Sequence, residues 1–182
     1  MTDLMTLTAL GEQTPRTLSL APYTISENSR LGLASLALAR GAKVPAPFGL
    51  TLPEPGGWYG QDGYAAIWIA PDQWLVLGER MGDTDFAAMV GAQAPQTRVS
   101  EQTDGWVSIE IEAGETALSA LLERLVNLPT DATQTGRATR TGLHHMSVFV
   151  IRPAKDRLVV MGMRSMAGSL WHAIETTVRR LI

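Results

Sequence analysis

Residues 106–127 read WVSIEIEAGETALSALLERLVN, and this stretch decides the fold class. From Val107 to Ile111 every second residue is apolar, which is the period of a strand with one buried face. After Gly114 the apolar residues change to the spacing of three and four that makes a one-sided stripe on a helix. The stretch therefore predicts a strand at 106–112 followed directly by a helix at 115–127.

The same two periods continue on both sides of this stretch. Neighbouring strands are joined by short turns such as Pro71-Asp72, which implies antiparallel pairing. The sequence therefore predicts the α+β class, with antiparallel sheets and helices packed on them, rather than a doubly wound parallel sheet. The further elements expected are strands at 64–70, 73–77, 97–100, 137–142, 145–152 and 157–163, and helices at 83–90 and 165–181.

The first third of the chain has weaker patterns. Residues 1–28 show no sustained period and contain Pro15 and Pro22, so we interpret them as an extended N-terminal arm with one strand near 16–20. Residues 29–182 then form a single α+β domain. Within it, the Ala- and Leu-rich segment 28–41 predicts a helix, although its leucines also fit part of an alternating strand. Residues 43–64 are rich in Gly and Pro and predict a long loop.

Composition excludes several classes of function. The chain has 182 residues, a formal net charge of −3 and a pI near 5.6, which argues against nucleic acid as the main ligand. It has no cysteine, so disulfides, thiolate metal sites and cysteine nucleophiles are impossible. No apolar run is long enough for a membrane span, and Met1–Leu10 lacks the basic region of a signal peptide. We expect a soluble, cytoplasmic protein without a membrane partner.

Motifs for catalysis and cofactor binding are missing from the sequence. It contains no phosphate-binding glycine motif, no HExxH and no GxSxG. His144 and His145 are adjacent, and on a strand they would point to opposite faces, so we interpret them as structural rather than as a metal pair. His172 is far from both in sequence. We expect no catalytic, cofactor-binding or metal-binding residue in this chain.

Pairs of acidic residues have structural interpretations too. Glu110 and Glu112 share one face of a strand, roughly 6–7 Å apart, which resembles the carboxylate separation of a glycosidase. We interpret them as the solvated face of that strand, and Asp83 and Asp85 as charges favoured at a helix start.

Charge is distributed unevenly along the chain. Residues 1–132 carry a net charge of −9 and residues 133–182 carry a net charge of +6. We favour ion pairing between these two parts over a basic end that docks to a partner.

Three residues are candidates for a partner interface. Trp58 and Tyr59 lie in the Gly/Pro-rich loop, which cannot easily bury both side chains within its own fold. Arg164 stands where the last helix begins, at the helix end that disfavours a cation, so an external carboxylate would explain it. The competing interpretation is that Arg164 pairs with an acidic residue in the first part of the chain.

Three segments carry a resemblance to a known family. They are the hairpin Trp68–Leu77, the strand–strand–helix region Val99–Leu122, and the motif Arg164–Trp171. Together they resemble the gamma subunit of heterotetrameric sarcosine oxidase, over about residues 30–180. This sequence departs from that family's pattern at Ala70, Gln73 and Met166, where a glycine, an acid and an aromatic residue are expected.

The resemblance implies a fold and a role. The family is similar to the folate-binding domain of the glycine-cleavage aminomethyltransferase. It implies a small, non-catalytic gamma subunit packed against large alpha and beta subunits and a small delta subunit. Their complex oxidises sarcosine to glycine and transfers the methyl carbon to tetrahydrofolate, with hydrogen peroxide as product. FAD, FMN, NAD and tetrahydrofolate are then implied for the complex, and none is expected on this chain alone. The alternatives are a free-standing folate- or one-carbon-binding protein and a homo-oligomeric binding domain on the same fold.

Overall fold

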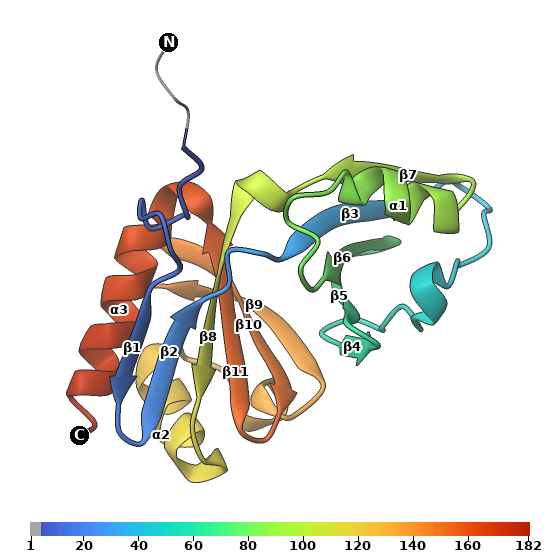
Figure 1. Cartoon of the computed structure of the whole chain (residues 1–182). Coiled ribbons are helices and arrows are strands. Elements are labelled where there is room, and N and C mark those ends of the chain that lie inside the picture. Colours follow the sequence, from blue (N-terminus) through green and yellow to red (C-terminus); the bar gives the residue numbers. More distant parts are fainter. Residues whose placement is uncertain (1–4) are drawn as a thin grey trace.

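The computed structural model describes residues 5–182 and has four layers (Figure 1). Two antiparallel sheets pack face to face. Helices α2 (Glu115–Leu125) and α3 (Ala167–Arg179) cover the outer face of the larger sheet, and α1 (Phe86–Gln93) covers the outer face of the smaller one. This architecture confirms the predicted α+β class. No helix among residues 5–182 has the length and apolar character needed to span a bilayer.

The six-stranded sheet has the order β1-β2-β8-β11-β10-β9, and every neighbouring pair is antiparallel. Alternation along each strand sends one set of side chains toward α2 and α3 and the other toward the second sheet. Its strands are β1 (Thr17–Leu20), β2 (Tyr23–Glu27), β8 (Trp106–Glu112), β9 (Arg137–Leu143), β10 (Met146–Ala154) and β11 (Arg157–Met163).

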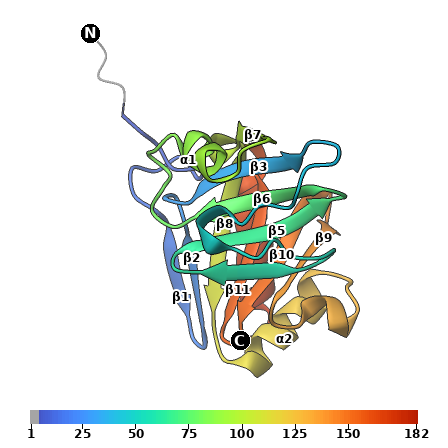
Figure 2. The same ribbon diagram turned by 90° about the vertical axis from the view of Figure 1, so that its right-hand side faces the viewer.

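The five-stranded sheet has the order β4-β5-β6-β3-β7 and is also antiparallel throughout. It lies across the six-stranded sheet, as Figure 2 shows. Its strands are β3 (Gly32–Leu38), β4 (Trp58–Gln61), β5 (Tyr64–Ala70), β6 (Gln73–Gly78) and β7 (Thr97–Glu101).

The whole five-stranded sheet is inserted between two paired strands of the six-stranded one. Strand β2 pairs directly with β8, with Glu27 opposite Ile109, and the chain between them builds β3 to β7. At the opposite edge the Trp58 amide donates to the Gly136 carbonyl (2.8 Å) and the Ala138 amide to the Gly56 carbonyl (3.0 Å). The two sheets are therefore tied by the chain on one side and by backbone hydrogen bonds on the other.

Three apolar clusters fill the spaces between the four layers. The first lies between the six-stranded sheet and helices α2 and α3, and the second between the five-stranded sheet and α1. The third lies between the sheets, where Ile67 of β5 and Ile151 of β10 are almost completely buried. Burial on both faces of both sheets explains why long apolar runs coexist with clean alternation in this sequence.

The structure corrects the prediction of a helix at 28–41. This segment contains β3, a central strand between β6 and β7. Ala34 and Leu36 face α1, while Leu33 on the opposite side faces the other sheet. Because both faces are buried, apolar residues occur without the strict alternation that marks a half-exposed strand, and the Ala and Leu content then favours helix.

The N-terminal arm and the long loop are also corrected in part. Residues 17–27 form the hairpin β1–β2, and β2 pairs with β8 in the six-stranded sheet rather than belonging to an extended arm. Residues 1–4 of the predicted arm lie outside the described part. The loop predicted at 43–64 ends in strand β4, which pairs with β5. The strand predicted near 16–20 is confirmed as β1, whereas β2 and β4 are short strands that the sequence does not indicate.

Candidate functional site

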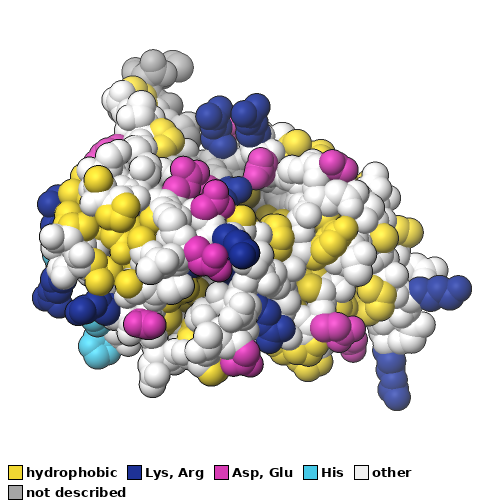
Figure 3. All heavy atoms as spheres, turned by 90° about the horizontal axis from the view of Figure 1, so that it is seen from below, with side chains coloured by type: hydrophobic (Ala, Val, Ile, Leu, Met, Phe, Trp, Pro, Cys, Tyr) yellow, Lys and Arg dark blue, Asp and Glu magenta, His cyan; other side chains and the backbone are white. Residues whose placement is uncertain are grey.

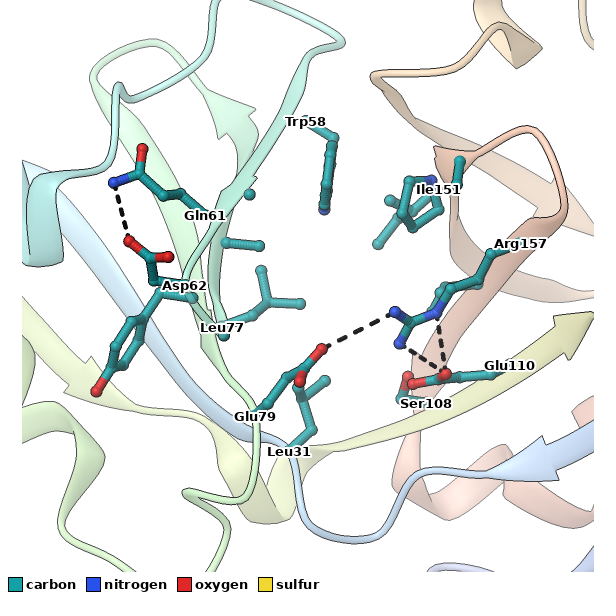
Figure 4. Close-up of a pocket in the computed structure, with 17 residues that line it drawn as sticks. Leu31, Trp58, Gln61, Asp62, Leu77, Glu79, Ser108, Glu110, Ile151 and Arg157 are labelled. Carbon is teal, nitrogen blue, oxygen red and sulfur yellow. Dashed lines mark hydrogen bonds and ion pairs between the residues drawn. The ribbon is translucent and has the colours of Figure 1, made fainter.

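A cleft of about 340 Å³ opens between the two sheets, and we refer to it as the inter-sheet cleft (Figure 4). The turn between β4 and β5 forms one wall, and β8 with the β10–β11 turn forms the other. Its lining includes Leu31, Trp58, Gln61, Asp62, Leu77, Glu79, Ser108, Glu110, Ile151 and Arg157.

An ion-paired arginine crosses this cleft. The Arg157 guanidinium donates from Nη2 (2.7 Å) and Nε (3.1 Å) to Oε2 of Glu110, and its Nη1 lies 3.9 Å from Oε1 of Glu79. Nδ2 of Asn28 donates to the other oxygen of Glu110 at 2.7 Å. Both carboxylate oxygens of Glu110 are thus engaged, so this carboxylate does not resemble a free general base.

The remaining polar groups of the cleft give it an acidic balance. Asp62 in the β4–β5 turn accepts a hydrogen bond from Nε2 of Gln61 at 3.2 Å. The cleft lining therefore carries three carboxylates, those of Asp62, Glu79 and Glu110, and one guanidinium, that of Arg157. Ser108 is buried, and its hydroxyl has no hydrogen-bond partner among the described residues. Such a cleft suits a neutral or cationic group better than a polyanion.

The paired carboxylates singled out in the sequence do not form a catalytic pair. Glu110 is mostly buried against Arg157, whereas Glu112 is exposed at the end of β8 and lines a different hollow. The expected solvated face is therefore correct for Glu112 and wrong for Glu110. At the start of α1, Oδ1 of Asp85 accepts from the Ala88 amide at 3.0 Å, which confirms its assignment as a helix-start residue. No group of three potential metal ligands occurs within residues 5–182.

The two loop candidates for a partner interface have different environments. Trp58 is half-buried on β4 and packs against the apolar cluster between the sheets, so its indole is covered in part within its own fold. Tyr59 points to the opposite face of the strand and is 36% exposed. Its hydroxyl donates to Oε1 of Gln61 at 3.0 Å. Of the two, Tyr59 is the one available to a partner.

Arg164 lies in a 3-10 turn, Arg164–Met166, just before α3. Its Nη2 donates to the backbone carbonyl of Leu7 at 2.8 Å, and no ion pair joins it to a carboxylate within the described residues. Leu7, Met163 and Met166 around it are exposed by 46%, 49% and 37%. Arg164 thus lies beside exposed apolar side chains, and we call Leu7, Met163, Arg164 and Met166 the methionine patch.

The two oppositely charged parts of the chain do pair internally, as favoured from the sequence. Arg157 pairs with Glu110 and Glu79, and Lys155 pairs with Glu115. Sequence reasoning missed the ion pair between Arg157 and Glu110. The pair forms only because β11 and β8 are neighbours in the sheet, in a register that sets Val159 opposite Glu110. Nothing in the local sequence around either residue indicates this pairing.

His144 and His145 lie in the two-residue turn between β9 and β10 rather than on a strand. Both are exposed, and both line a hollow that His172 of α3 also lines. The prediction that the two rings point to opposite faces of a strand is therefore wrong, because the strand begins one residue later than expected, at Met146.

The chain is similar in fold to two solved structures. One is a chain in the heterotetrameric sarcosine oxidase from Corynebacterium sp. U-96 in complex with pyrrole 2-carboxylate. The TM-score is 0.72 at 18% sequence identity, over 87% of this chain and 84% of that one. The other is the glycine cleavage system aminomethyltransferase T from Bartonella henselae, with a TM-score of 0.57 at 12% identity, over 81% of this chain and 44% of that one. The sequence matches no protein-family model and no curated protein.

Proposed function

We propose that this chain is a small, non-catalytic gamma subunit of a heterotetrameric sarcosine oxidase. In this role it supports assembly of the subunits that bind flavin and folate and oxidise sarcosine to glycine. One observation carries the proposal: the likeness to a sarcosine oxidase chain extends over 87% of this chain and 84% of that one. The two chains are therefore of similar length, as expected for equivalent subunits rather than for one domain of a larger enzyme.

The state of the inter-sheet cleft supports a non-catalytic role. Its best-placed carboxylate, Glu110, is held by Arg157 and Asn28. Oε2 of Glu110 accepts both hydrogen bonds from Arg157 and Oε1 accepts one from Asn28, so this carboxylate is held in a charge-assisted pair rather than presented to a substrate.

The cofactors implied for the complex do not fit this cleft. FAD, FMN and NAD carry phosphates, and tetrahydrofolate carries glutamate carboxylates, so each would meet an excess of like charge from Asp62, Glu79 and Glu110. Under the proposal these cofactors belong to the large alpha and beta subunits. This chain contacts those subunits and the small delta subunit in the cytoplasm, without nucleic acid or membrane.

The methionine patch and Tyr59 are the proposed contact surfaces. Methionine, tyrosine and arginine are enriched at protein interfaces, and exposed apolar side chains gain most from being covered. Trp58 is removed from the set of anchors because its indole packs within this chain. Arg164 stays in it, since its bond to a backbone carbonyl leaves the guanidinium charge without a carboxylate among residues 5–182.

Co-expression with the alpha, beta and delta subunits of a sarcosine oxidase tests the proposal. We expect the wild-type chain to co-purify with them, and Tyr59→Ala and Arg164→Ala each to weaken association by about 2 kcal/mol or more, roughly 30-fold. The exposed Arg98 on β7 provides the matched control, Arg98→Ala, which should assemble normally. Melting temperatures of all variants should be unchanged. Failure of the wild-type chain to assemble would overturn the subunit proposal.

A second candidate function is a free-standing folate- or one-carbon-binding protein. It is favoured by the volume of the cleft, about 340 Å³, which lies within the range of small-molecule sites, while the acidic lining favours a neutral or cationic one-carbon compound over folate itself. A homo-oligomeric binding domain is the third. Two measurements on the isolated chain separate these candidates, calorimetry with tetrahydrofolate and analytical sedimentation. Binding of tetrahydrofolate without partner subunits supports the free-standing binding protein. A stable oligomer that does not bind tetrahydrofolate supports the homo-oligomeric domain.

A further inference from the structure

All three histidines of the chain line one hollow of about 490 Å³. His144 and His145 come from the β9–β10 turn, and His172 comes from α3. Arg124 near the end of α2 and Arg180 at the end of α3 also line it, and we call this hollow the histidine–arginine pocket. Figure 3 shows histidine side chains beside Lys and Arg side chains at one end of the molecule, at the left of that view.

Helix geometry explains why α3 contributes so much to this pocket. His172, Thr176 and Arg180 are spaced by four residues and so lie along one face of the helix. Nε2 of His172 lies 3.5 Å from the hydroxyl of Thr176. The opposite face of α3 is buried against the six-stranded sheet, so the polar stripe faces the pocket and solvent.

The charge of the histidine–arginine pocket is of one sign. No carboxylate is among its described lining residues. On α3, Glu175 is already bound, because it accepts from Nε of Arg179 (2.9 Å) and Nε1 of Trp171 (3.1 Å). On α2, Glu123 is exposed and does not line the pocket. Arg140 of β9 adds a further cation in an adjoining hollow that both turn histidines share.

His144 has a left-handed backbone conformation. Its φ is +50°, in the left-handed region, within a two-residue turn where glycine, asparagine or aspartate is usual. Residues held in such conformations concentrate at binding sites and active sites. Histidine adopts a positive φ more often than most non-glycine residues, so the turn is compatible with it, and the residue in this conformation is also one that lines the pocket.

The pocket also has apolar walls. Leu125, Met146 and Ala173 are buried beneath the cationic side chains. Guanidinium groups bind carboxylates and phosphates through two parallel hydrogen bonds, and an apolar floor accommodates a carbon skeleton. We propose that the histidine–arginine pocket binds a small organic anion that bears two or more phosphate or carboxylate groups, and that it binds more tightly as the pH falls.

The pH dependence follows from the residue types. Imidazole is the side chain whose ordinary titration lies between pH 5 and 8, while guanidinium stays charged throughout. Any dependence of binding on pH in this range would therefore come from imidazole rather than from guanidinium. Glu175, Glu123, Arg140 and Arg179 are the other charged groups around the pocket.

Calorimetry on the full chain at constant ionic strength tests the proposal. Benzene-1,3-disulfonate, which keeps two charges at both pH values, should bind at least tenfold more tightly at pH 5.5 than at pH 7.5. Arg180→Gln should weaken binding about tenfold at both pH values, and the triple variant His144→Gly/His145→Gln/His172→Gln should remove the pH dependence. Arg98→Gln on β7 is the matched control and should bind as the wild type does. Inorganic pyrophosphate and citrate at pH 6 then separate phosphate from carboxylate ligands.

His144→Gly is the most diagnostic variant. Glycine adopts a positive φ without strain, so this variant should melt at the same temperature as the wild type or higher, and yet should bind the disulfonate several-fold more weakly. Equal affinity at both pH values, unchanged binding by His144→Gly, or an equal loss in Arg98→Gln would each overturn the proposal. Binding of a poly-glutamate peptide but of none of the three small anions would overturn it in favour of an acidic protein partner.

Discussion

Glu101 illustrates how a single carboxylate organises three elements. At the end of β7 it accepts hydrogen bonds from the Ala87 amide in α1 (3.0 Å), from the hydroxyl and amide of Thr103, and from the Gln102 amide. Burial by itself would raise the pKa of Glu101, but these hydrogen bonds together outweigh burial and lower the pKa below its ordinary value. The ionised side chain therefore holds the first turn of α1 against the end of β7.

This arrangement predicts a specific dependence of stability on pH. Because the pKa of Glu101 is lower in the folded state than in the unfolded state, its contribution is complete above about pH 4.3 and is lost as the pH falls through the folded-state pKa. Glu101→Gln should therefore lose less free energy of unfolding than the wild type between pH 5 and pH 3, measured with urea. The exposed Glu123 provides the control, Glu123→Gln, which should follow the wild type. Parallel curves for Glu101→Gln and wild type would contradict the assignment.

The candidate site is only partly predictable at the level of single residues. Tyr59 and Arg164 stand out because exposed aromatic and unmatched cationic residues are visible in sequence. The burial of Trp58 escapes prediction, since it depends on a second sheet that its own loop does not indicate. The meeting of His144 with His172 is equally hidden, because it depends on how α3 lies along the sheet rather than on either local pattern.

At the scale of secondary-structure elements, the close approach of two backbone segments explains why Gly32 and Gly78 are glycines. Gly32 of β3 lies opposite Gly78 of β6, and the segment after β6 folds back over them, with the Gly82 amide donating to the Arg30 carbonyl at 3.0 Å. A Cβ at position 32 would lie 2.7 Å from Cβ of Met81 and 3.0 Å from its carbonyl carbon. There is no room for a side chain at this crossing.

Gly32→Ala should therefore destabilise the protein by about 1–3 kcal/mol, because the backbone of the crossing segment has to move. Gly91 in α1 is the matched control: outside its own helix backbone, no heavy atom lies within 4 Å of the point that an alanine methyl would occupy. Gly91→Ala should stabilise the protein by roughly 0.5–1 kcal/mol, since alanine favours helix. Denaturant unfolding of both variants should give shifts of opposite sign, and a neutral Gly32→Ala would show that the crossing is loosely packed.

Elements after residue 64 are predicted well from the sequence and those before it poorly, for a physical reason. Helix α2 buries one face, so its period is visible in the sequence. Strands β6, β10 and β11 bury both faces, but they are rich in β-branched and aromatic residues and are bounded by short turns, which also predict strands. Strand β3 buries both faces and contains no β-branched residue, and β4 is only four residues long, whereas the strand predicted near 16–20 is found as β1. In those cases tertiary contacts, and not local periodicity, determine the structure.

For the molecule as a whole, the apolar cluster between the sheets couples the two halves. Ile67 of β5 is completely buried there and packs toward the six-stranded sheet. Ile67→Ala should lower the free energy of unfolding by about 2–5 kcal/mol. Trp74 in one sheet and Trp171 in α3 report on the two halves, so fluorescence and far-UV circular dichroism should show one shared transition.

Ile182, which is 62% exposed, provides the control for this prediction. Ile182→Ala should change the free energy of unfolding by less than about 0.5 kcal/mol. Two separate transitions in Ile67→Ala, with fluorescence preceding circular dichroism, would mean that the five-stranded sheet unfolds as an independent unit.

The insertion of one sheet between β2 and β8 has a consequence for synthesis on the ribosome. Glu27 must wait for its partner Ile109, which is translated 82 residues later. At roughly 5–20 residues per second this delay is about 4–16 s, far longer than a hairpin needs to form. During that interval the strands of the inserted sheet are still being made, the last of them, β7, ending only eight residues before Ile109, and the β1–β2 hairpin presents an unpaired edge. The nascent chain therefore has a window in which a chaperone, or a neighbouring nascent chain, can capture that edge.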